Sequence, residues 1–401
     1  MSKGMKIRTV LSLFDGISAG RVALERANIS YDNYYASEID KYAISITQHN
    51  YPNTIQLGDV TKWREWDIDW SSIDLLFAGF PCQSWSLAGQ QKGDEDPRGK
   101  LLWVMLEIRE HILKYNPNLS YLFENVNMKK EFQEYINKNI GVTPHLINSG
   151  TLSAQNRKRL YWTNIPNVEQ PEDKNIYLYD ILLPEEEIEE RYYIKNIKEI
   201  NWVCNKERIR KKYTSINTEK AITMTARQYG SWNGNYFCEP VRLINIGKGG
   251  QGERVYYVNA KSTTLSALGG WRGAKTGLYL VAQRGRNIVD GKRKDYNGAP
   301  TEQRLETRVD LKTNTLTTVQ KDNYVLLEID NQYYRIRKLH PKECEALQTM
   351  PKDFTKYGED NTEISDTQRY KALGNSWTVD VIAHILSFLG TDPKADYRRL
   401  F

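Results

Sequence analysis

The sequence of 401 residues lacks the features that mark metal-binding, secreted and membrane-embedded proteins. Its five histidines are scattered and its four cysteines show no CxxC or Cys/His metal spacing, so we expect reduced thiols and no metal site. No apolar run approaches the roughly 20 residues of a membrane helix. The run Val10–Phe14 is too short for a signal peptide and is typical of a first buried strand. Heptads are also absent. We therefore expect a cytoplasmic monomer without a membrane partner.

Positive charge is concentrated in the middle of the chain. The formal net charge is +6. Between Arg191 and Lys321 there are 25 Lys and Arg against 10 Asp and Glu, a balance of +15 that leaves −9 for the rest of the chain. A mildly acidic body with a basic segment is typical of a protein that binds a polyanion through that segment. A solvated basic face without a partner explains the charge equally well.

The first 163 residues alternate short apolar runs with amphipathic stretches, which predicts βαβ units and a doubly wound, mostly parallel α/β sheet with helices on both faces. The predicted strands are Thr9–Phe14, Tyr34–Ser37, Leu75–Ala78 and Tyr121–Glu124. The predicted helices are Arg21–Ala27, Lys41–His49 and Leu101–Tyr115.

The amino-acid composition changes from about residue 190 to 335, where Gly, Thr, Tyr, Asn and Arg dominate and helical periods are few. Helical patterns return in Pro341–Thr349 and Ser376–Leu389. We therefore predict a catalytic α/β domain (1–164), an inserted smaller β-rich domain (165–336) and a C-terminal segment that completes the first domain (337–401). Three similar Thr-rich segments, 220–226, 261–267 and 312–318, favour duplicated hairpins in the insert.

A Gly-rich turn and two acids at successive predicted strand ends point to a nucleoside ligand. The turn Phe14–Gly20 allows the backbone to approach a ligand at a helix N-terminus. Glu38 stands where a carboxylate accepts from ribose hydroxyls, and Asp59 where it accepts from an adenine amino group. A tight structural turn is the commoner explanation of the glycines alone. The nucleoside ligand is therefore inferred from the two acids together with the turn.

Three further groups of polar residues stand at predicted strand ends. Cys82, within Gly79–Ser86, is a candidate nucleophile, although an inert loop cysteine is the commoner case. Glu124 ends the next strand. Arg157 and Arg159 alternate into a strand, so both could face a cleft. Any one of these could be a surface residue without a role, but their joint occurrence at strand ends favours an active site.

In their order along the chain, these motifs resemble those of the DNA cytosine-5 methyltransferase family, in its bacterial and phage form. The resemblance implies a Rossmann-like S-adenosylmethionine-dependent fold, S-adenosylmethionine as cofactor and double-stranded DNA as substrate. It implies that Cys82 adds to C6 of a flipped cytosine, that Glu124 supplies a proton at N3 and that Arg159 binds O2. Arg157 would orient Cys82 or Glu124. The loop Ser84–Lys100 would act as a lid.

The same resemblance implies a set of cofactor contacts, namely Phe14, Asp15, Gly16, Ile17, Ser18, Gly20, Glu38, Ile39, Asp59, Val60, Pro81, Asn375 and Ser376. Three positions depart from the family pattern. Asp15 stands where bacterial members usually carry Ala or Ser, Ile39 where Trp is frequent, and Trp377 where Val is usual. Phe14 remains to stack on one face of the adenine.

The resemblance also predicts DNA contacts from Gln83 and Ser86 and from the middle of the chain. Residues 246–277 are similar to the recognition loops of a small bacterial member that modifies GCGC. The match carries over Gln251, Arg254, Thr264 and Ser266, and it predicts a GC-containing target and a role for Gln251 in filling the gap left by the flipped base.

A restriction endonuclease acting on the same site is a possible partner. The alternatives are an RNA cytosine methyltransferase of the same fold and an inactive DNA-binding homologue.

Overall fold

The computed structural model describes residues 6–81, 100–194, 197–240, 278–286, 288–289, 292–293, 302–308, 323–329 and 332–390. The chain forms two compact units, which are described separately. Unit 1 takes its residues from 1–182, 219–228 and 341–401, and unit 2 from 183–218 and 229–340. The division into domains 1–164, 165–336 and 337–401 stays a prediction. The sequence did not reveal that residues 219–228 return to unit 1.

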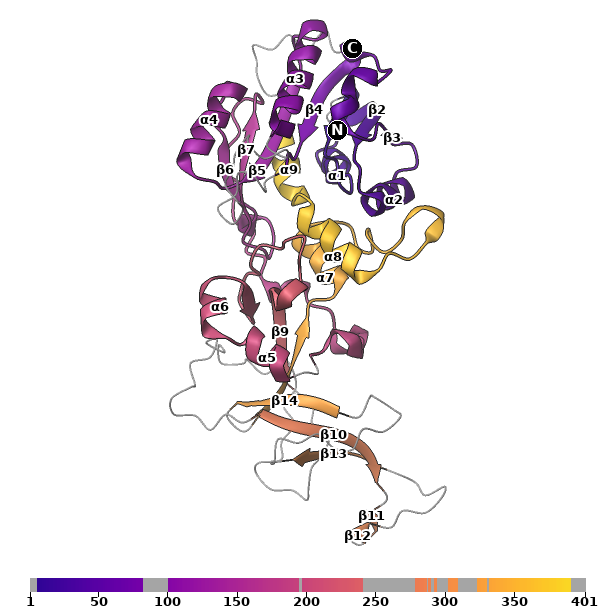
Figure 1. The fold of residues 1–401 in the computed structure, drawn as a ribbon, viewed down its shortest axis with the longest axis vertical. Helices are drawn as coiled ribbons and strands as arrows, with labels where there is room; N and C mark the ends of the chain where they lie inside the picture. The colour runs from indigo at the N-terminus through magenta and orange to yellow at the C-terminus, as the bar shows by residue number, and fades with distance from the viewer. Residues whose placement is uncertain are drawn as a thin grey trace. The chain divides into compact units, whose positions relative to one another are not determined.

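Unit 1 contains a seven-stranded sheet in the order β3-β2-β1-β4-β5-β7-β6 (Figure 1). Strands β1 to β5 pair in parallel, and β7 pairs antiparallel with both β5 and β6. Every residue of β4 is buried, as expected for a strand covered on both faces. This sheet confirms the predicted fold class. Its strands are β1 Lys6–Leu13, β2 Ser30–Ser37, β3 Ile55–Gln56, β4 Ile73–Ala78, β5 Ser120–Val126, β6 His145–Asn148 and β7 Lys158–Thr163.

Helices from both ends of the chain belong to unit 1. They are α1 Ala19–Arg26, α2 Lys41–Asn50, α3 Lys100–Tyr115, α4 Lys130–Ile140, α7 Pro341–Leu347, α8 Asp366–Asn375 and α9 Val379–Leu386. The C-terminal α9, drawn in yellow in Figure 1, packs against the N-terminal α1. Arg26 and Asp380 form an ion pair between these two helices. The C-terminal segment therefore completes the layer of helices that begins at the N-terminus.

The predicted helix over Ser376–Leu389 is wrong at its start. Helix α8 continues to Asn375, and α9 begins only at Val379. Between them Ser376 and Thr378 have extended backbone angles, with ψ of 160° and 111°. The apolar period of α9 did not show this break, in which Trp377 packs against Phe77 of β4. The break places Trp377 between two helices.

Unit 2 is built around a six-stranded sheet in the order β13-β10-β14-β15-β9-β8. Its strands are β8 Thr214–Ile216, β9 Gly234–Pro240, β10 Leu278–Arg286, β13 Glu302–Arg308, β14 Asn323–Ile329 and β15 Gln332–Lys338, with a separate pair β11 Ile288–Val289 and β12 Lys292–Arg293. Helices α5 Ile197–Val203 and α6 Lys206–Arg210 precede all of these strands in the chain. This is the smaller β-rich part that the sequence predicted.

A buried ion pair lies within unit 2. Arg337, with no exposed side-chain surface, pairs through Nε with Oε1 of Glu239, and the hydroxyl of Tyr193 donates to Oε2 at 2.6 Å. Around it, Ile194, Ile200, Val203, Tyr236, Cys238 and Ile336 form an apolar cluster. Satisfying both oxygens of Glu239 offsets part of the cost of burying its charge.

The prediction of duplicated Thr-rich hairpins is wrong for the first segment. Residues 220–226 form no strand, and their backbone contact is a bridge between Ala221 and Gln155 in unit 1. The segments 261–267 and 312–318 lie outside the described residues. Alternating Thr suits any extended chain, so the sequence pattern could not separate a hairpin from an extended segment that packs elsewhere.

Candidate active site and cofactor site

The Gly-rich turn after β1 has an unusual backbone. Phe14, Gly16 and Ser18 all have positive φ, at 56°, 60° and 56°. Two of the three are not glycine, and such residues store strain that the surrounding structure must offset. The side chain of Phe14 packs partly buried against the core of unit 1. The turn is therefore held in one conformation by its surroundings.

Glu38 ties the end of β2 to this turn. Its Oε2 accepts from the backbone N–H of Gly16 at 2.8 Å, and its Oε1 accepts from those of Ile39 and Asp40, both at 2.8 Å. A carboxylate has about four acceptor positions, so these three bonds leave about one for a ligand hydroxyl. The carboxylate that the sequence assigned to ribose is thus oriented by the backbone beside the turn.

Hydrogen bonds to its carboxylate account for Asp15, which departs from the family pattern. Its Oδ1 accepts from the hydroxyl of Tyr34 at 2.7 Å, and its Oδ2 accepts from the hydroxyl of Ser18. Burial raises the pKa of the Asp15 carboxyl to about 6, against the opposing effect of hydrogen bonds from neighbouring hydroxyls. Tyr34 is itself 2% exposed. Asp15 therefore anchors the turn to β2 from within.

Three further predicted cofactor residues follow strands of the sheet, Ile39 after β2 and Asp59 and Val60 after β3. Asp59 begins the 3-10 helix η1 (Val60–Glu65) and accepts from the N–H and hydroxyl of Thr61, both at 2.9 Å, which holds its pKa below the usual value. Ile39 is 77% exposed, whereas Val60 is buried. An exposed isoleucine next to an ordered carboxylate fits an apolar ring attached to a sugar. These residues fit the adenosine part of S-adenosylmethionine.

Glu124 and Arg159 form an ion pair between two antiparallel strands. Arg159 Nε lies 2.9 Å from Glu124 Oε1, and each side chain is 12% exposed. The pairing of β5 with β7 sets Val126 opposite Arg159, which brings the arginine to the carboxyl end of β5. A cation and a carboxylate thus meet at the edge of the sheet where ligands bind in open α/β folds.

Trp377 contacts the same carboxylate. Its indole Nε1–H donates to Glu124 Oε2 at 3.2 Å. The sequence showed only that Trp377 departs from the usual Val. It gave no sign of this contact, because the two residues are 253 positions apart.

Gln155 and Arg157 bind backbone rather than this carboxylate. Arg157, which is 4% exposed, donates to the carbonyl oxygens of Met224 at 2.9 Å, Gly374 at 3.3 Å and Ser376 at 3.0 Å. Gln155 accepts from the N–H of Met224 at 2.8 Å and donates to the carbonyl of Leu347 at 3.2 Å. These bonds tie Arg157 to backbone atoms of unit 1, and its role in orienting Cys82 or Glu124 stays a prediction.

The sequence of this chain matches one known family over most of its length. The sequence model of the family described as C-5 cytosine-specific DNA methylase matches residues 8–390. The chain belongs to this family. The enzyme class predicted from the motifs, DNA (cytosine-5)-methyltransferase, is thereby confirmed, and double-stranded DNA is the class of substrate on which these enzymes act.

Curated relatives match this methylase over almost its whole length. The type II methyltransferase M.HhaI of Haemophilus parahaemolyticus is 28% identical over 403 residues, covering 95% of this chain and 94% of its own. The orphan methyltransferase M.SPRI of Bacillus phage SPR is 28% identical over 456 residues, covering 95% of this chain and 97% of its own. Both types of relative are DNA-modifying methyltransferases of the bacterial and phage form that the motifs resemble.

Solved structures share the fold of the methylase. Entamoeba histolytica methyltransferase EhMeth gives a TM-score of 0.57 at 17% identity, covering 98% of this chain and 100% of that chain. A DNMT2 variant of Spodoptera frugiperda gives 0.52 at 17% identity, covering 95% and 99%. Likeness at this identity concerns the fold alone.

Several predicted site residues of the methylase lie outside the described residues. They are Cys82, Gln83, Ser86, Gln251, Arg254, Thr264 and Ser266, with most of the loop Ser84–Lys100. The chain leading to Cys82 is described as far as Pro81. Asn125, next to Glu124, donates through Nδ2 to the carbonyl of Phe80 at 3.1 Å. The approach to Cys82 is therefore bonded to the strand that carries Glu124.

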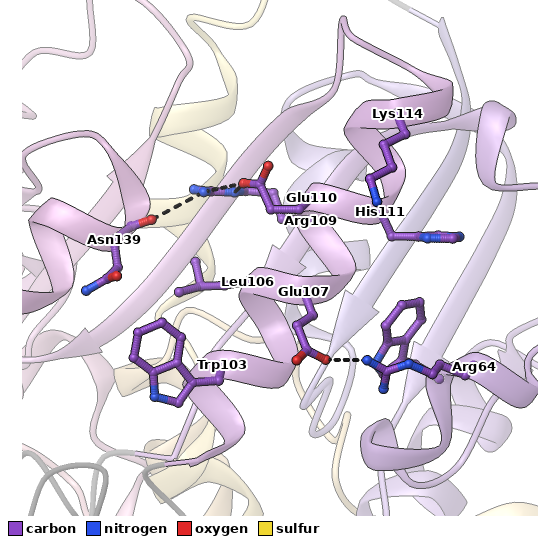
Figure 2. Close-up of a pocket in the computed structure, with 10 residues that line it drawn as sticks. Arg64, Trp103, Leu106, Glu107, Arg109, Glu110, His111, Lys114 and Asn139 are labelled. Carbon is purple, nitrogen blue, oxygen red and sulfur yellow. Dashed lines mark hydrogen bonds and ion pairs between the residues drawn. The ribbon is translucent and has the colours of Figure 1, made fainter.

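A cavity of about 540 Å³ is lined by residues of α3 and η1, with Asn139 of α4. Figure 2 shows Arg64 paired with Glu107 and Arg109 directed at Glu110 and Asn139. Among the predicted site residues that the structure describes, none lines it. Its arginines already have anionic partners, which leaves little net charge to select a ligand.

Metal-ligand clusters and membrane-spanning helices are both absent from the described part of the chain. No group of three or more His, Cys, Asp or Glu within them is arranged to hold a metal ion. No helix among the described residues is long and apolar enough to cross a membrane.

Proposed function

We propose that this methylase transfers a methyl group from S-adenosylmethionine to C5 of a cytosine flipped out of duplex DNA, through a covalent bond between Cys82 and C6. The observation that carries the proposal is the Glu124–Arg159 pair at the carboxyl end of β5, beside the strand that leads to Cys82. A flipped base needs such groups, because its Watson–Crick edge is otherwise unsatisfied once it leaves the stack.

The protein residues have complementary tasks in this reaction. The Cys82 thiolate adds to C6, the C5=C6 electron pair forms a C4=C5 bond, and the C4=N3 pair takes a proton at N3 from Glu124. Arg159 stabilises the negative charge that builds toward O2. C5 is then an enamine carbon and reacts with an electrophile. Loss of the N3 proton to Glu124 and of the C5 proton to a base re-forms C5=C6 and releases Cys82 as thiolate.

S-adenosylmethionine supplies the electrophile, a methyl group on a positively charged sulfur. Glu38 and the Phe14–Ser18 turn would hold its ribose, while Ile39, Phe14 and Asp59 would contact the adenine. Gly20, Ile17, Pro81, Asn375 and Ser376 complete the proposed set. Of the last two, Asn375 is exposed and Ser376 is buried at the end of α8.

Comparison of the cysteines supports the choice of Cys82. Burial raises the pKa of the Cys204 thiol to about 11 and raises that of Cys238 further. Thiols of this kind are almost wholly protonated at neutral pH and are poor nucleophiles. Cys344 has no exposed surface. Each of these three described thiols is thus a weak candidate, and Cys82 follows a strand end of the catalytic unit.

The basic middle of the chain would read the target. Unit 2 has the β-rich form of a recognition domain, and the resemblance of residues 246–277 supports a GC-containing site. Gln83 and Ser86 would contact DNA near the flipped base. We further propose that the enzyme acts as a cytoplasmic monomer, either beside a restriction endonuclease of the same specificity or, like M.SPRI, as an orphan.

The first experiment expresses the wild type, Cys82→Ala and Cys204→Ala in cells without DNA methylation, followed by bisulfite sequencing of the plasmid. Wild type and Cys204→Ala should protect cytosines within one short motif, and Cys82→Ala should protect none. Equal protection by Cys82→Ala would rule out the covalent step. If a folded wild type protects no cytosine in DNA, an assay of methyl transfer to RNA separates an RNA substrate from an inactive protein.

A further inference from the structure

The two oxygens of Glu124 have different donors. Oε1 accepts from the guanidinium of Arg159, a cation, at 2.9 Å, while Oε2 accepts from the neutral indole N–H of Trp377 at 3.2 Å. We propose that Trp377 is a positioning residue that assigns the two oxygens of Glu124 to different edges of the cytosine, with the transferable proton on Oε2. The inference rests on the proposed acid role of Glu124.

The indole is fixed by contacts that the carboxylate does not provide. Trp377 lies in the break between α8 and α9, and its ring meets Phe77 of β4 edge-on, with centroids 5.7 Å apart and planes at 88°. A Cβ added at Gly79 would lie 2.9 Å from the indole nitrogen. Only glycine at this position, just after β4, leaves room for the indole. The N–H therefore reaches Glu124 from a rigid support.

The inequality of the donors decides where a proton resides. A charged donor holds the charged oxygen more strongly than a neutral one does. The pair with Arg159 thus favours negative charge on Oε1, and a proton on the carboxyl group favours Oε2. A protonated oxygen keeps an acceptor position, so the indole bond is retained. Oε1 is then left to accept from the amino group of cytosine, and Oε2 to donate to N3.

The indole bond becomes stronger during the reaction. As the bond between sulfur and C6 forms, the proton on Oε2 moves to N3 and the carboxyl group becomes a carboxylate. A hydrogen bond to an ionised acceptor is roughly twice as strong as one to a neutral acceptor. An interaction that strengthens toward the transition state raises kcat and leaves substrate binding unchanged. Trp377 would thus affect the rate of addition rather than the affinity for DNA or cofactor.

The test compares Trp377→Phe, which keeps an aromatic ring and removes the N–H, with the wild type. We expect kcat to fall about tenfold, the loss typical of one hydrogen bond to a charged group. KM for DNA and cofactor should stay within about twofold of the wild-type values, in line with an interaction that strengthens toward the transition state. Exchange of the C5 proton with solvent, measured without cofactor, should fall by the same factor as kcat.

A double-mutant cycle with Glu124→Gln separates positioning from packing. In the Gln variant the amide oxygen faces Arg159 and the amide nitrogen faces Trp377, so no acceptor remains for the indole. Trp377→Phe should then lower the residual rate less than twofold. An equal loss in both backgrounds, or an unchanged kcat for Trp377→Phe alone, would overturn the inference. A wild-type rate for Glu124→Gln would instead show that the acid role itself is wrong. Melting temperatures of all variants establish that each is folded.

Discussion

Arg159 reaches Oε1 of Glu124 across the antiparallel pair of β5 and β7, with 2.9 Å between the charged atoms. Each side chain keeps 12% of its surface exposed. The pair is therefore sheltered enough for the charges to interact strongly and open enough for a ligand to reach them. An ion pair with a purely structural role would not require this exposure to solvent.

Replacement of Arg159 by Met should lower the single-turnover rate of methylation by about 100-fold to 1000-fold. The reason is that the developing charge on the base loses its cationic partner, as when a donor is removed from an oxyanion hole. The matched control is Arg64→Met, which breaks the exposed pair of Arg64 with Glu107. That variant should methylate at the wild-type rate. Similar rates for both variants would remove Arg159 from the active site.

Replacement of Arg157 should lower the stability of the protein and have little effect on the methylation rate, in contrast to Arg159→Met. Arg157→Lys leaves carbonyl oxygens of Met224, Gly374 and Ser376 without a full set of donors in a buried place, which we expect to cost about 2–4 kcal/mol of stability. Chemical denaturation of unit 1 measures this loss. At low temperature the folded fraction should methylate within a few-fold of the wild type. A stable variant with a 1000-fold lower rate would instead support the orienting role that the sequence suggested.

The pH dependence of stability should report Asp15. The folded protein holds this proton up to about pH 6, whereas a free Asp releases it near pH 3.8. The stability contributed by protonated Asp15 is therefore present below about pH 4 and is lost as the pH rises to 6. Asp15→Asn removes this dependence and should be more stable than the wild type at pH 7, by about 2 kcal/mol.

Denaturation midpoints between pH 4.5 and 7.5 test the role of Asp15. A suitable comparison is Asp69→Asn, because a hydrogen bond from Ser71 lowers the pKa of Asp69. That variant should lose stability relative to the wild type, or leave it unchanged, at every pH in this range. Parallel curves for the wild type and Asp15→Asn would show that Asp15 titrates normally.

Glu38→Gln should weaken cofactor binding about 10-fold to 100-fold, because an amide offers one acceptor oxygen where the carboxylate offers two. Titration calorimetry with S-adenosylhomocysteine measures the affinity without turnover. Glu65→Gln, an exposed change at the end of η1, is the control and should bind normally. Normal binding by Glu38→Gln would leave Glu38 with its structural bonds to Gly16, Ile39 and Asp40 alone.

Local patterns predicted the parts of the site that depend on strand ends. Glu38 and Glu124 each follow buried apolar runs, and in a parallel sheet such positions meet at one edge. The pattern did not reveal the partners of Arg157, which precedes the first residue of β7, Lys158, and donates to segments far along the chain. Alternation within a strand gives a direction to a side chain but does not reveal its partners.

Local sequence patterns could not predict contacts between segments that are distant in the chain. A Cβ at Gly374 would lie 2.1 Å from the carbonyl oxygen of Thr225, so this glycine is required by a segment that returns from between the two parts of unit 2. The sequence does not show this contact, because Gly374 and Thr225 lie far apart along the chain and the alternating Thr of 220–226 suits any extended segment. The same holds for Trp377, whose acceptor belongs to a strand near the middle of unit 1.

The packing of α9 against α1 has a consequence for synthesis on the ribosome. Helix α1 leaves the ribosome early, but the helix that covers it begins at Val379. At about 5–20 residues per second, the intervening chain takes on the order of 20–70 seconds to appear. During that interval the apolar face of α1 has no native cover from α9. The nascent protein must therefore keep its first βα unit from aggregating until α9 has been synthesised.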